Sequence, residues 1–167
     1  MILFRQLLFV VLLFITVPAF AEPSFEDAFS PGQGATELIV KTIGKAKHSI
    51  RVAAYSFTSK PIAEALVKAH KGGIDIKIVL DKSQDKERYS SLTFFRNQDI
   101  PVRINYKYAI MHNKFMVIDN NIIQIGSLNY TKAAEKENAE NVLVITDAGK
   151  VAEDYTIQWE KLWDESE

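Results

Sequence analysis

The sequence predicts an α/β protein whose mixed, mostly parallel β-sheet carries helices on both faces. Two β-type segments, residues 49–57 and 74–80, alternate with two helical patterns, residues 61–71 and 85–97. Such alternation implies parallel strands joined by right-handed helical crossovers. Beyond residue 100 short β-type segments follow one another without helices between them, which makes the predicted sheet mixed. The sequence shows no internal repeat.

The first elements follow from apolar spacing and from turn residues. Apolar positions in residues 35–46 recur at helical spacing, and the Gly- and Pro-containing loop 31–34 precedes them. Residues 49–57 are rich in β-branched and aromatic side chains, which predicts a strand. Residues 58–61 then supply a helix cap and an early proline, so we expect a helix over 61–71 that ends at Gly72-Gly73.

The second half is predicted in the same way. Residues 74–80 change from alternating to wholly apolar and predict a buried strand, and the charged stretch 85–97 predicts a helix that packs Leu92 and Phe95. A hairpin turn is expected at 119–121. Asp147 can cap a closing helix whose apolar residues, Val151 to Leu162, recur at helical spacing. The expected short strands are 101–104, 111–118, 122–125 and 142–145.

Three segments are expected along the chain. Residues 1–21 combine one positive charge, an apolar run and the small residues Ala19 and Ala21, which is typical of a secretory signal. A retained membrane anchor is the alternative, although the run is shorter than the roughly 20 residues of a spanning helix. Residues 22–33 are interpreted as an N-terminal extension and 34–165 as one domain. Signal cleavage predicts a periplasmic or secreted bacterial protein without stable membrane association.

Charge and cysteine content limit the chemistry. The 167 residues include no cysteine, so neither disulfides nor thiolate metal sites are available. Residues 41–114 carry fifteen Lys or Arg against six acids, whereas residues 135–167 carry ten acids against three Lys. The basic block could attract a polyanion. Alternatively, its charges are simply solvated and pair with the acidic end of the chain.

One of the three histidines, His112, stands out. His48 precedes a strand in a Lys-rich turn, and His70 lies near a helix C-terminus, where positive charge is favourable. His112 and Lys114 instead lie within an apolar segment, where burying either without a partner would be costly. Alternation in a strand would point both side chains at one anion. This pairing suggests phosphodiester cleavage.

The run from His112 through Lys114 to Asp119, followed by Gly126-Ser127-Leu128-Asn129, resembles the HKD motif of the phospholipase D superfamily. The chain looks most like the small, secreted, single-motif bacterial endonucleases of the Nuc type, and the resemblance covers roughly residues 34–165. It implies a phospholipase D-like fold and a metal-independent, sequence-nonspecific endonuclease acting on DNA, with RNA as a further candidate. One residue rather than two between Ser127 and Asn129 also matches the small nucleases.

The resemblance also implies roles for individual residues. His112 would attack phosphorus to give a phosphohistidine, and Lys114 and Asn129 would hold the non-bridging oxygens. Ser127 would add a hydrogen bond, and Glu140 would accept from Nδ1 of the histidine. Asp119 should face away from His112 and act as a structural acceptor at the hairpin.

A single motif supplies one histidine where the family chemistry uses two. We therefore expect a homodimer with one composite site on its two-fold axis. No cluster of metal-ligand residues is evident and no cofactor is expected. Five aromatic side chains near the motif could stack on bases: Tyr55, Phe57, Tyr106, Tyr108 and Tyr130. Alternatively, most of them pack in the core or at its rim. Two other functions stay open, a phospholipase acting on phosphatidyl lipids and a noncatalytic nucleic-acid-binding or DNA-uptake module.

Overall fold

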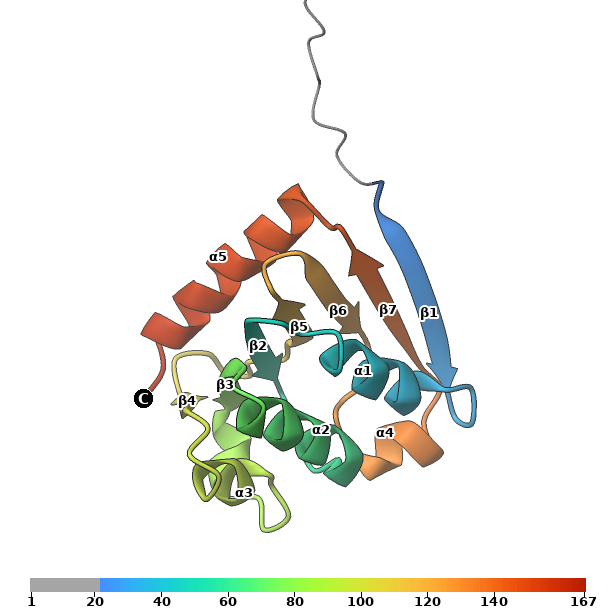
Figure 1. Ribbon diagram of the computed structural model, residues 1–167. Helices are drawn as coiled ribbons and strands as arrows, with labels where there is room; N and C mark the ends of the chain where they lie inside the picture. The colour runs from blue at the N-terminus through green and yellow to red at the C-terminus, as the bar shows by residue number, and fades with distance from the viewer. Residues whose placement is uncertain (1–21) are drawn as a thin grey trace, which may run out of the picture.

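The computed structural model describes residues 22–167, so the predicted signal in residues 1–21 lies outside the described residues. Seven strands form one sheet in the order β1-β7-β6-β5-β2-β3-β4 (Figure 1). The strands are β1 (Ser24–Ser30), β2 (Ser49–Ala54), β3 (Asp75–Asp81), β4 (Val102–Asn105), β5 (Lys114–Ile118), β6 (Ile122–Gly126) and β7 (Glu140–Thr146). The helices are α1 (Ala35–Ile43), α2 (Lys60–Lys71), the 3-10 turn η1 (Lys82–Asp85), α3 (Leu92–Arg96), α4 (Lys132–Lys136) and α5 (Lys150–Asp164).

The sheet is mixed and has helices on both faces, which confirms the predicted fold class. The expected majority of parallel strands was wrong, however. Two pairings, β2 with β3 and β3 with β4, are parallel, and the other four are antiparallel. A parallel pair needs a long crossover, and the segments containing α2 and α3 provide one for each parallel pair. β5 and β6 are joined by a hairpin turn, and β6 and β7 pair antiparallel although the segment between them contains α4.

Two apolar clusters lie on opposite faces of the sheet. α1 and α2 cover one face, where Ile39 and Leu66 pack against alternate residues of the strands such as Val52 and Met116. In Figure 1 these two helices lie in front of the sheet. α5 covers part of the other face with Trp159, whose indole N–H donates to the Val52 carbonyl oxygen at 2.8 Å. The two helical layers differ in how much of the sheet they cover.

The N-terminal segment joins the sheet. The sequence pattern did not predict a strand in the segment interpreted as an extension, yet β1 pairs antiparallel with β7 along its whole length. Its side chains alternate between exposed and buried only near its end, at Ala28 and Ser30. This short alternation explains why apolar periodicity did not reveal the strand.

Three local predictions needed correction. The expected helix 85–97 is a 3-10 turn and a short α3, although Leu92 and Phe95 are buried as predicted. Asp147 does not cap α5: it has φ of 55° and accepts a hydrogen bond from Asn121 at 2.9 Å, while Gly149 precedes the helix. The strand expected over 111–118 begins only at Lys114. In each case a local side-chain contact or turn replaced the regular pattern.

Among residues 22–167 no helix combines the length and the apolar character needed to cross a membrane.

Candidate active site at the end of the central strands

The predicted catalytic histidine lies at the end of the sheet where β2 ends and β5 begins. Ala54 pairs with Lys114, and the Tyr55 N–H donates to the Asn113 carbonyl oxygen at 2.9 Å. His112 is therefore in an extended loop just before β5, and its side chain is exposed. The expected strand alternation does not operate there, but the pocket at this edge is still lined by both His112 and Lys114.

Lys114 is the unusual cation of this site because its side chain is almost buried. Its Nζ donates to the His112 carbonyl oxygen at 2.8 Å and lies 5.3 Å from the centroid of the Tyr55 ring. Burial lowers the pKa of Lys114, and the negative charge of Glu140 partly opposes this effect. A desolvated ammonium group with few partners would gain from binding an anion.

Tyr55 connects the two predicted catalytic side chains. Its ring lies 4.6 Å from the imidazole of His112, centroid to centroid, with an interplanar angle of 56°. Lys114 Nζ lies 5.3 Å from the centroid of the same ring. One aromatic ring thus contacts both groups and limits the orientations that the His112 imidazole can take.

Ser127 and Glu140 form the second part of the site. The Ser127 hydroxyl donates to Glu140 Oε2 at 2.5 Å and accepts from the Asn141 N–H at 3.1 Å, while Asn138 donates to the other carboxylate oxygen at 3.4 Å. Within the described residues Glu140 thus bonds Ser127 and Asn138, and it makes no hydrogen bond with His112. The expected orientation of His112 by Glu140 is not seen within the single chain, and the role of Glu140 remains a prediction.

Gly126 permits the close contact between β6 and β7 beside Ser127. Its φ is 154°, and a Cβ added there would lie 2.1 Å from the Asn141 carbonyl oxygen. That same oxygen accepts from the Ser127 N–H at 3.1 Å. Any side chain at this position would separate the strands and displace Ser127, which gives the glycine of the motif a physical reason.

Asn129 lies on the loop between β6 and α4. Its Oδ1 is buried and has no hydrogen-bond partner within residues 22–167. The neighbouring Tyr130 fixes the loop: its hydroxyl donates to Gln124 at 2.6 Å, and its carbonyl oxygen accepts from Thr58 and Ser59 at 2.8 Å. Tyr130 and Phe57 are fully buried, so these two aromatic residues pack in the core rather than offering surfaces to bases.

Asp119 lies at the opposite end of β5. Its carboxylate accepts three backbone N–H groups, from Lys47, His48 and Ser49, each at 2.8 Å. Burial works against the charged form, but these three donors outweigh it and hold the pKa of Asp119 below its usual value of 3.8. This placement agrees with the structural part that the sequence analysis gave to Asp119.

Asp81 was missed by the sequence analysis. It ends β3 and is buried, and its carboxylate accepts the Met111 N–H at 2.7 Å and the Ser83 N–H at 2.9 Å. The first of these bonds anchors the backbone one residue before His112. The sequence feature that could have revealed Asp81 is an acid at the end of an apolar strand, because ligand sites often lie at the carboxyl ends of parallel strands.

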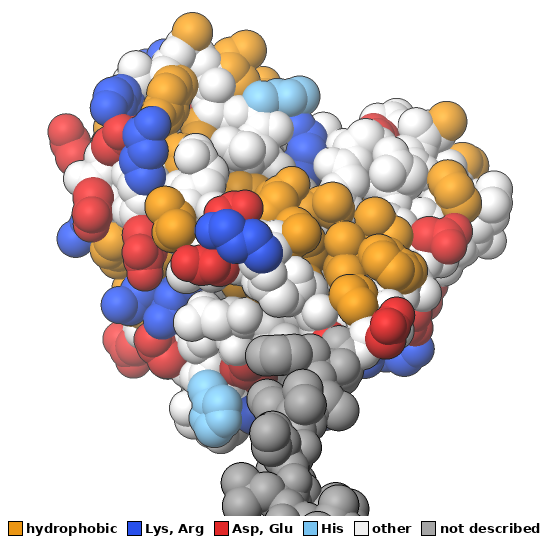
Figure 2. All heavy atoms as spheres, turned by 90° about the horizontal axis from the view of Figure 1, so that it is seen from above, with side chains coloured by type: hydrophobic (Ala, Val, Ile, Leu, Met, Phe, Trp, Pro, Cys, Tyr) orange, Lys and Arg blue, Asp and Glu red, His pale blue; other side chains and the backbone are white. Residues whose placement is uncertain are grey.

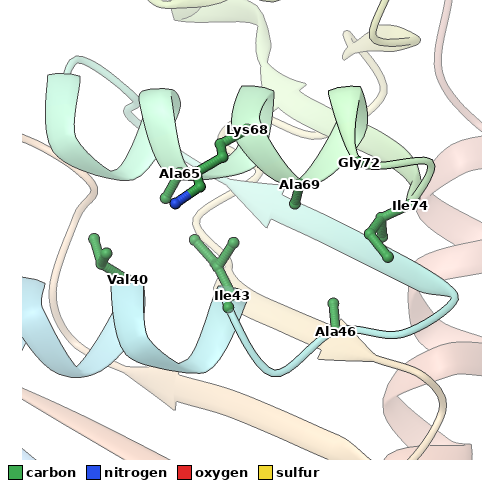
Figure 3. A pocket seen from close by; sticks show the side chains of 9 residues that line it. Val40, Ile43, Ala46, Ala65, Lys68, Ala69, Gly72 and Ile74 are labelled. Atoms are coloured by element: carbon green, nitrogen blue, oxygen red, sulfur yellow. The ribbon is translucent and has the colours of Figure 1, made fainter.

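An apolar groove elsewhere in the molecule has different chemistry. Figure 3 shows Val40 and Ile43 of α1 facing Ala65 and Ala69 of α2, and Lys68 is the one charged residue among those that line the groove. No histidine or carboxylate lines it. The groove therefore offers no nucleophile, and the candidate active site is the edge with His112.

The basic block keeps most of its charge available. Among residues 22–167 a single ion pair, Lys107 with Glu165 at 2.6 Å, joins the block to the acidic end of the chain. Lys41 and Lys45 instead pair with Glu26 of β1, and Arg51 pairs with Asp75 inside the block. Neutralisation by the acidic C-terminal region is thus a minor effect.

Three of the tyrosines considered for base stacking remain partly or fully accessible. Tyr55 is half-buried at the site, while Tyr106 and Tyr108 lie on the loop that leads to His112 and donate to Asp85 at 3.0 Å and to Glu165 at 2.8 Å. Within residues 22–167 no group of three or more His, Asp or Glu side chains is arranged to hold a metal ion.

Comparison with known proteins places this chain in a family. The model of the cardiolipin synthase, PLD-like domain matches residues 39–163. A phospholipase D from Rickettsia typhi is 37% identical over 144 residues, which cover 86% of this chain and 70% of that protein. A mitochondrial cardiolipin hydrolase from Xenopus laevis is 31% identical over 143 residues, 86% of this chain and 64% of its own length.

Solved structures give the same result for the fold. The phospholipase D family member Nuc from Salmonella typhimurium superposes with a TM-score of 0.84 at 40% identity, covering 87% of this chain and 97% of that one. NucT from Helicobacter pylori has a TM-score of 0.74 at 23% identity, with 86% and 98% covered. Because the family model matches most of this chain, residues 39–163, the chain belongs to the phospholipase D superfamily, whose members are phosphodiesterases.

Proposed function

We propose that this protein is a metal-independent, sequence-nonspecific endonuclease that hydrolyses DNA through a phosphohistidine intermediate, with RNA as a further candidate substrate. The observation that carries the proposal is the exposed imidazole of His112 beside the nearly buried ammonium of Lys114, at one pocket. An imidazole is a nucleophile without a metal, and the ammonium can neutralise charge on a phosphate. The 40% identity to Nuc supports a nuclease in particular.

The proposed reaction has two balanced displacements. In the first, a ring nitrogen of His112 bonds to phosphorus while the bond from phosphorus to the leaving oxygen breaks, and a second imidazole donates a proton to that oxygen. In the second, the same imidazole, now neutral, takes a proton from water, whose oxygen bonds to phosphorus and releases His112. Lys114 and Asn129 would hold the non-bridging oxygens in both steps, and Ser127 would position Glu140 beside Lys114.

The second imidazole would come from the partner subunit's His112 in a homodimer. His48 and His70, the other two histidines, lie in a Lys-rich turn and near the end of α2, and neither lines the pocket of His112. Subunit exchange between wild-type and His112→Asn protein tests this. Activity should fall with the square of the wild-type fraction, whereas a linear fall would show that each chain works alone.

The substrate class is tested with two substrates in the presence of EDTA. Purified protein should nick plasmid DNA, and its affinity should fall steeply with salt as phosphate contacts are lost. The relatives named phospholipase D and cardiolipin hydrolase make phosphatidyl lipid the second candidate substrate. Hydrolysis of phosphatidyl lipids in liposomes without nicking of DNA would overturn the nuclease proposal in favour of a phospholipase.

A noncatalytic nucleic-acid-binding module is the third candidate, and it would use the basic block alone. It requires DNA binding that His112→Asn leaves intact, with no cleavage by the wild-type protein. For localisation we propose the bacterial periplasm or secretion, on the strength of residues 1–21. N-terminal sequencing of the exported protein would test it, with Glu22 as the expected first residue.

A further inference from the structure

A second pocket lies between two helices that begin at the end of the sheet where His112 is found. Residues 58–61, around the start of α2, line one side of it, and Lys132, Glu135 and Lys136 of α4 line the other. The two helices lie side by side at the lower edge of Figure 1. We call this cavity of about 260 Å³ the α2–α4 pocket. Its lysines distinguish it from the broad hydrophobic patch that Figure 2 shows in the view from above.

The α2–α4 pocket has an excess of positive charge. Lys60, Lys132 and Lys136 line it together with one acid, Glu135. Lys136 pairs with Glu135 at 2.6 Å, and Lys60 pairs with Glu64 of its own helix at 3.6 Å, but both lysines are exposed and such pairs are weak. Lys132 forms no ion pair within residues 22–167. The first turn of α2 contains no acid, so the positive end of its dipole also favours an anion.

Ser59 gives the pocket a buried polar group without a partner. It is the N-cap residue of α2 and lines the pocket, yet its side chain makes no capping hydrogen bond. The residue is 2% exposed, and its Oγ has no hydrogen-bond partner within residues 22–167. A buried hydroxyl without a partner is uncommon and costly, and an acceptor oxygen of a ligand would satisfy it. Helix N-termini of this kind bind phosphate groups.

The α2–α4 pocket is joined to both loops of the candidate active site. The Tyr130 carbonyl oxygen accepts the two N–H groups of residues 58–59, each at 2.8 Å. This segment begins three residues after Tyr55, and Lys132 follows Asn129 by three residues. Three residues span at most roughly 10 Å, and successive phosphates of one DNA strand advance by about 3.4 Å along the duplex. A phosphate within a few nucleotides of the scissile bond can therefore reach the pocket.

We propose that the α2–α4 pocket binds a phosphate of the substrate strand that flanks the scissile phosphate at His112. This inference rests on the proposed function, because a nucleic-acid strand carries phosphates at regular spacing beside the bond that is cut. Lys132 supplies charge, and the Ser59 hydroxyl donates to a phosphate oxygen. The pocket volume is several times the roughly 30 Å³ of one water molecule, so it has room for the group. Such a contact strengthens binding without reading the bases.

A substrate with a single phosphate separates this pocket from the catalytic site. Lys132→Ala should raise KM for a duplex oligonucleotide about tenfold more than KM for bis(p-nitrophenyl) phosphate, which has no flanking phosphate. Lys71→Ala is the matched control, because Lys71 is an exposed lysine at the other end of α2. Equal losses on the two substrates, or no loss on either, would overturn the flanking site.

Binding in the absence of cleavage gives a second readout. In the His112→Asn background, Lys132→Ala should reduce the slope of log affinity against log salt by about one for the duplex, and Lys71→Ala should not. An unchanged slope would overturn the contact of Lys132 with phosphate. A reduced slope, together with a wild-type protein that cleaves neither substrate, would keep the phosphate site and reject the proposed function. Weaker binding to phosphatidylglycerol vesicles alone would reassign the pocket to a lipid headgroup and overturn the nucleic-acid strand.

Ser59→Ala tests the buried hydroxyl. Because Oγ has no partner within the described chain, its removal should leave the melting temperature unchanged or slightly higher. The affinity for the duplex should nevertheless fall by about three- to tenfold, since a hydrogen bond to a charged phosphate is lost. Fluorescence anisotropy of a labelled duplex and thermal unfolding measure the two quantities. Unchanged affinity would remove Ser59 from the phosphate site.

Discussion

The two ends of β5 belong to one sequence motif but differ in how completely their polar groups are satisfied. At the end near Asp119 the carboxylate accepts three backbone N–H groups, and the Asp119 N–H itself donates to the Ser49 carbonyl oxygen at 3.0 Å. At the end near His112 the imidazole is exposed, and the Lys114 ammonium is held by one carbonyl oxygen. The polar groups near Asp119 thus make their hydrogen bonds within the chain, whereas those near His112 can still bind a ligand.

This difference shows why a motif should not be interpreted as a list of catalytic residues. A group whose hydrogen bonds are all made inside the chain contributes to the native structure, while an under-satisfied cation beside an exposed nucleophile is available for substrate. Substitutions at the two ends should therefore separate activity from stability, and the expected effects are largest at the His112 end.

His112→Asn should abolish activity and leave the fold intact. The amide removes the proposed nucleophile, so the rate should fall on the order of 10³-fold or more, and the melting temperature should stay close to that of the wild type because the side chain is exposed. Plasmid nicking and thermal unfolding measure the two quantities. His48→Asn, whose side chain is also exposed, is the control at the other end of β5 and should keep full activity. Substantial nicking by His112→Asn would remove His112 from the chemistry.

The sequence pattern singled out the His112 end of β5 but not the contacts that surround it. His112, Lys114, Ser127 and Asn129 have chemically distinct side chains at fixed spacing, and such a pattern is visible in one dimension. The anchoring of Met111 by Asp81 joins positions thirty residues apart. Such a contact depends on the parallel pairing of β3, which no local pattern contains.

The same limitation applies to the architecture. Apolar periodicity predicted β2, α2 and β3, because these elements are buried on regular faces. It failed for β1, whose phenylalanines are largely exposed in the single chain. The hydrogen bond from Ser127 to the Glu140 carboxylate could not be predicted either, because it joins residues of β7 and of the loop after β6 that meet only through strand pairing.

Lys114→Met should lower the rate by about 10²- to 10³-fold, the usual effect of removing a donor that stabilises transition-state charge. Stability should be unchanged or slightly higher, because methionine avoids the cost of burying an ammonium group. Single-turnover rates and thermal unfolding test both points. Lys47→Met removes an exposed lysine near Asp119, so it should change neither the rate nor the melting temperature strongly. Similar losses in the two variants would mean that Lys114 acts only through general charge.

The lowered pKa of Lys114 adds a pH dependence. Because burial disfavours the charged form, Lys114 should lose its proton below the usual lysine value of 10.5, and the rate should decline as pH rises through that lower value. The folded protein binds fewer protons there than the unfolded chain, so Lys114 destabilises the fold below its folded pKa and this cost disappears as pH rises toward 10.5. Lys114→Met should remove the pH dependence of both quantities.

Asp119→Ala should act in the opposite sense, on stability rather than chemistry. It leaves three N–H groups without their acceptor and places alanine at φ of 53°, so the free energy of unfolding should fall by about 2–3 kcal/mol. The rate per folded molecule should be nearly unchanged. Asp119→Asn retains a residue that tolerates this φ and one acceptor oxygen, so its loss should be smaller. Urea unfolding and activity corrected for the folded fraction separate the effects.

The lowered pKa of Asp119 gives this prediction a pH window. The stabilisation is fully present above the unfolded value of 3.8 and is lost as pH falls through the lower folded value. The stability difference between wild type and Asp119→Asn should therefore shrink as the solution is acidified below 3.8. A constant difference would point to packing at the hairpin rather than to the carboxylate charge.

Glu140→Gln should give the smallest effect, about tenfold in rate, because glutamine can still accept from the Ser127 hydroxyl. The informative quantity is the pH profile. The negative charge of Glu140 raises the pKa of Lys114 against the effect of burial, so its removal should move the alkaline decline in rate to lower pH. Glu137→Gln, an exposed acid after α4, should leave the profile in place. An unshifted pH profile in Glu140→Gln would show that Glu140 acts through Ser127 alone. A loss of rate larger than tenfold at all pH values would instead support a role of Glu140 in orienting a histidine.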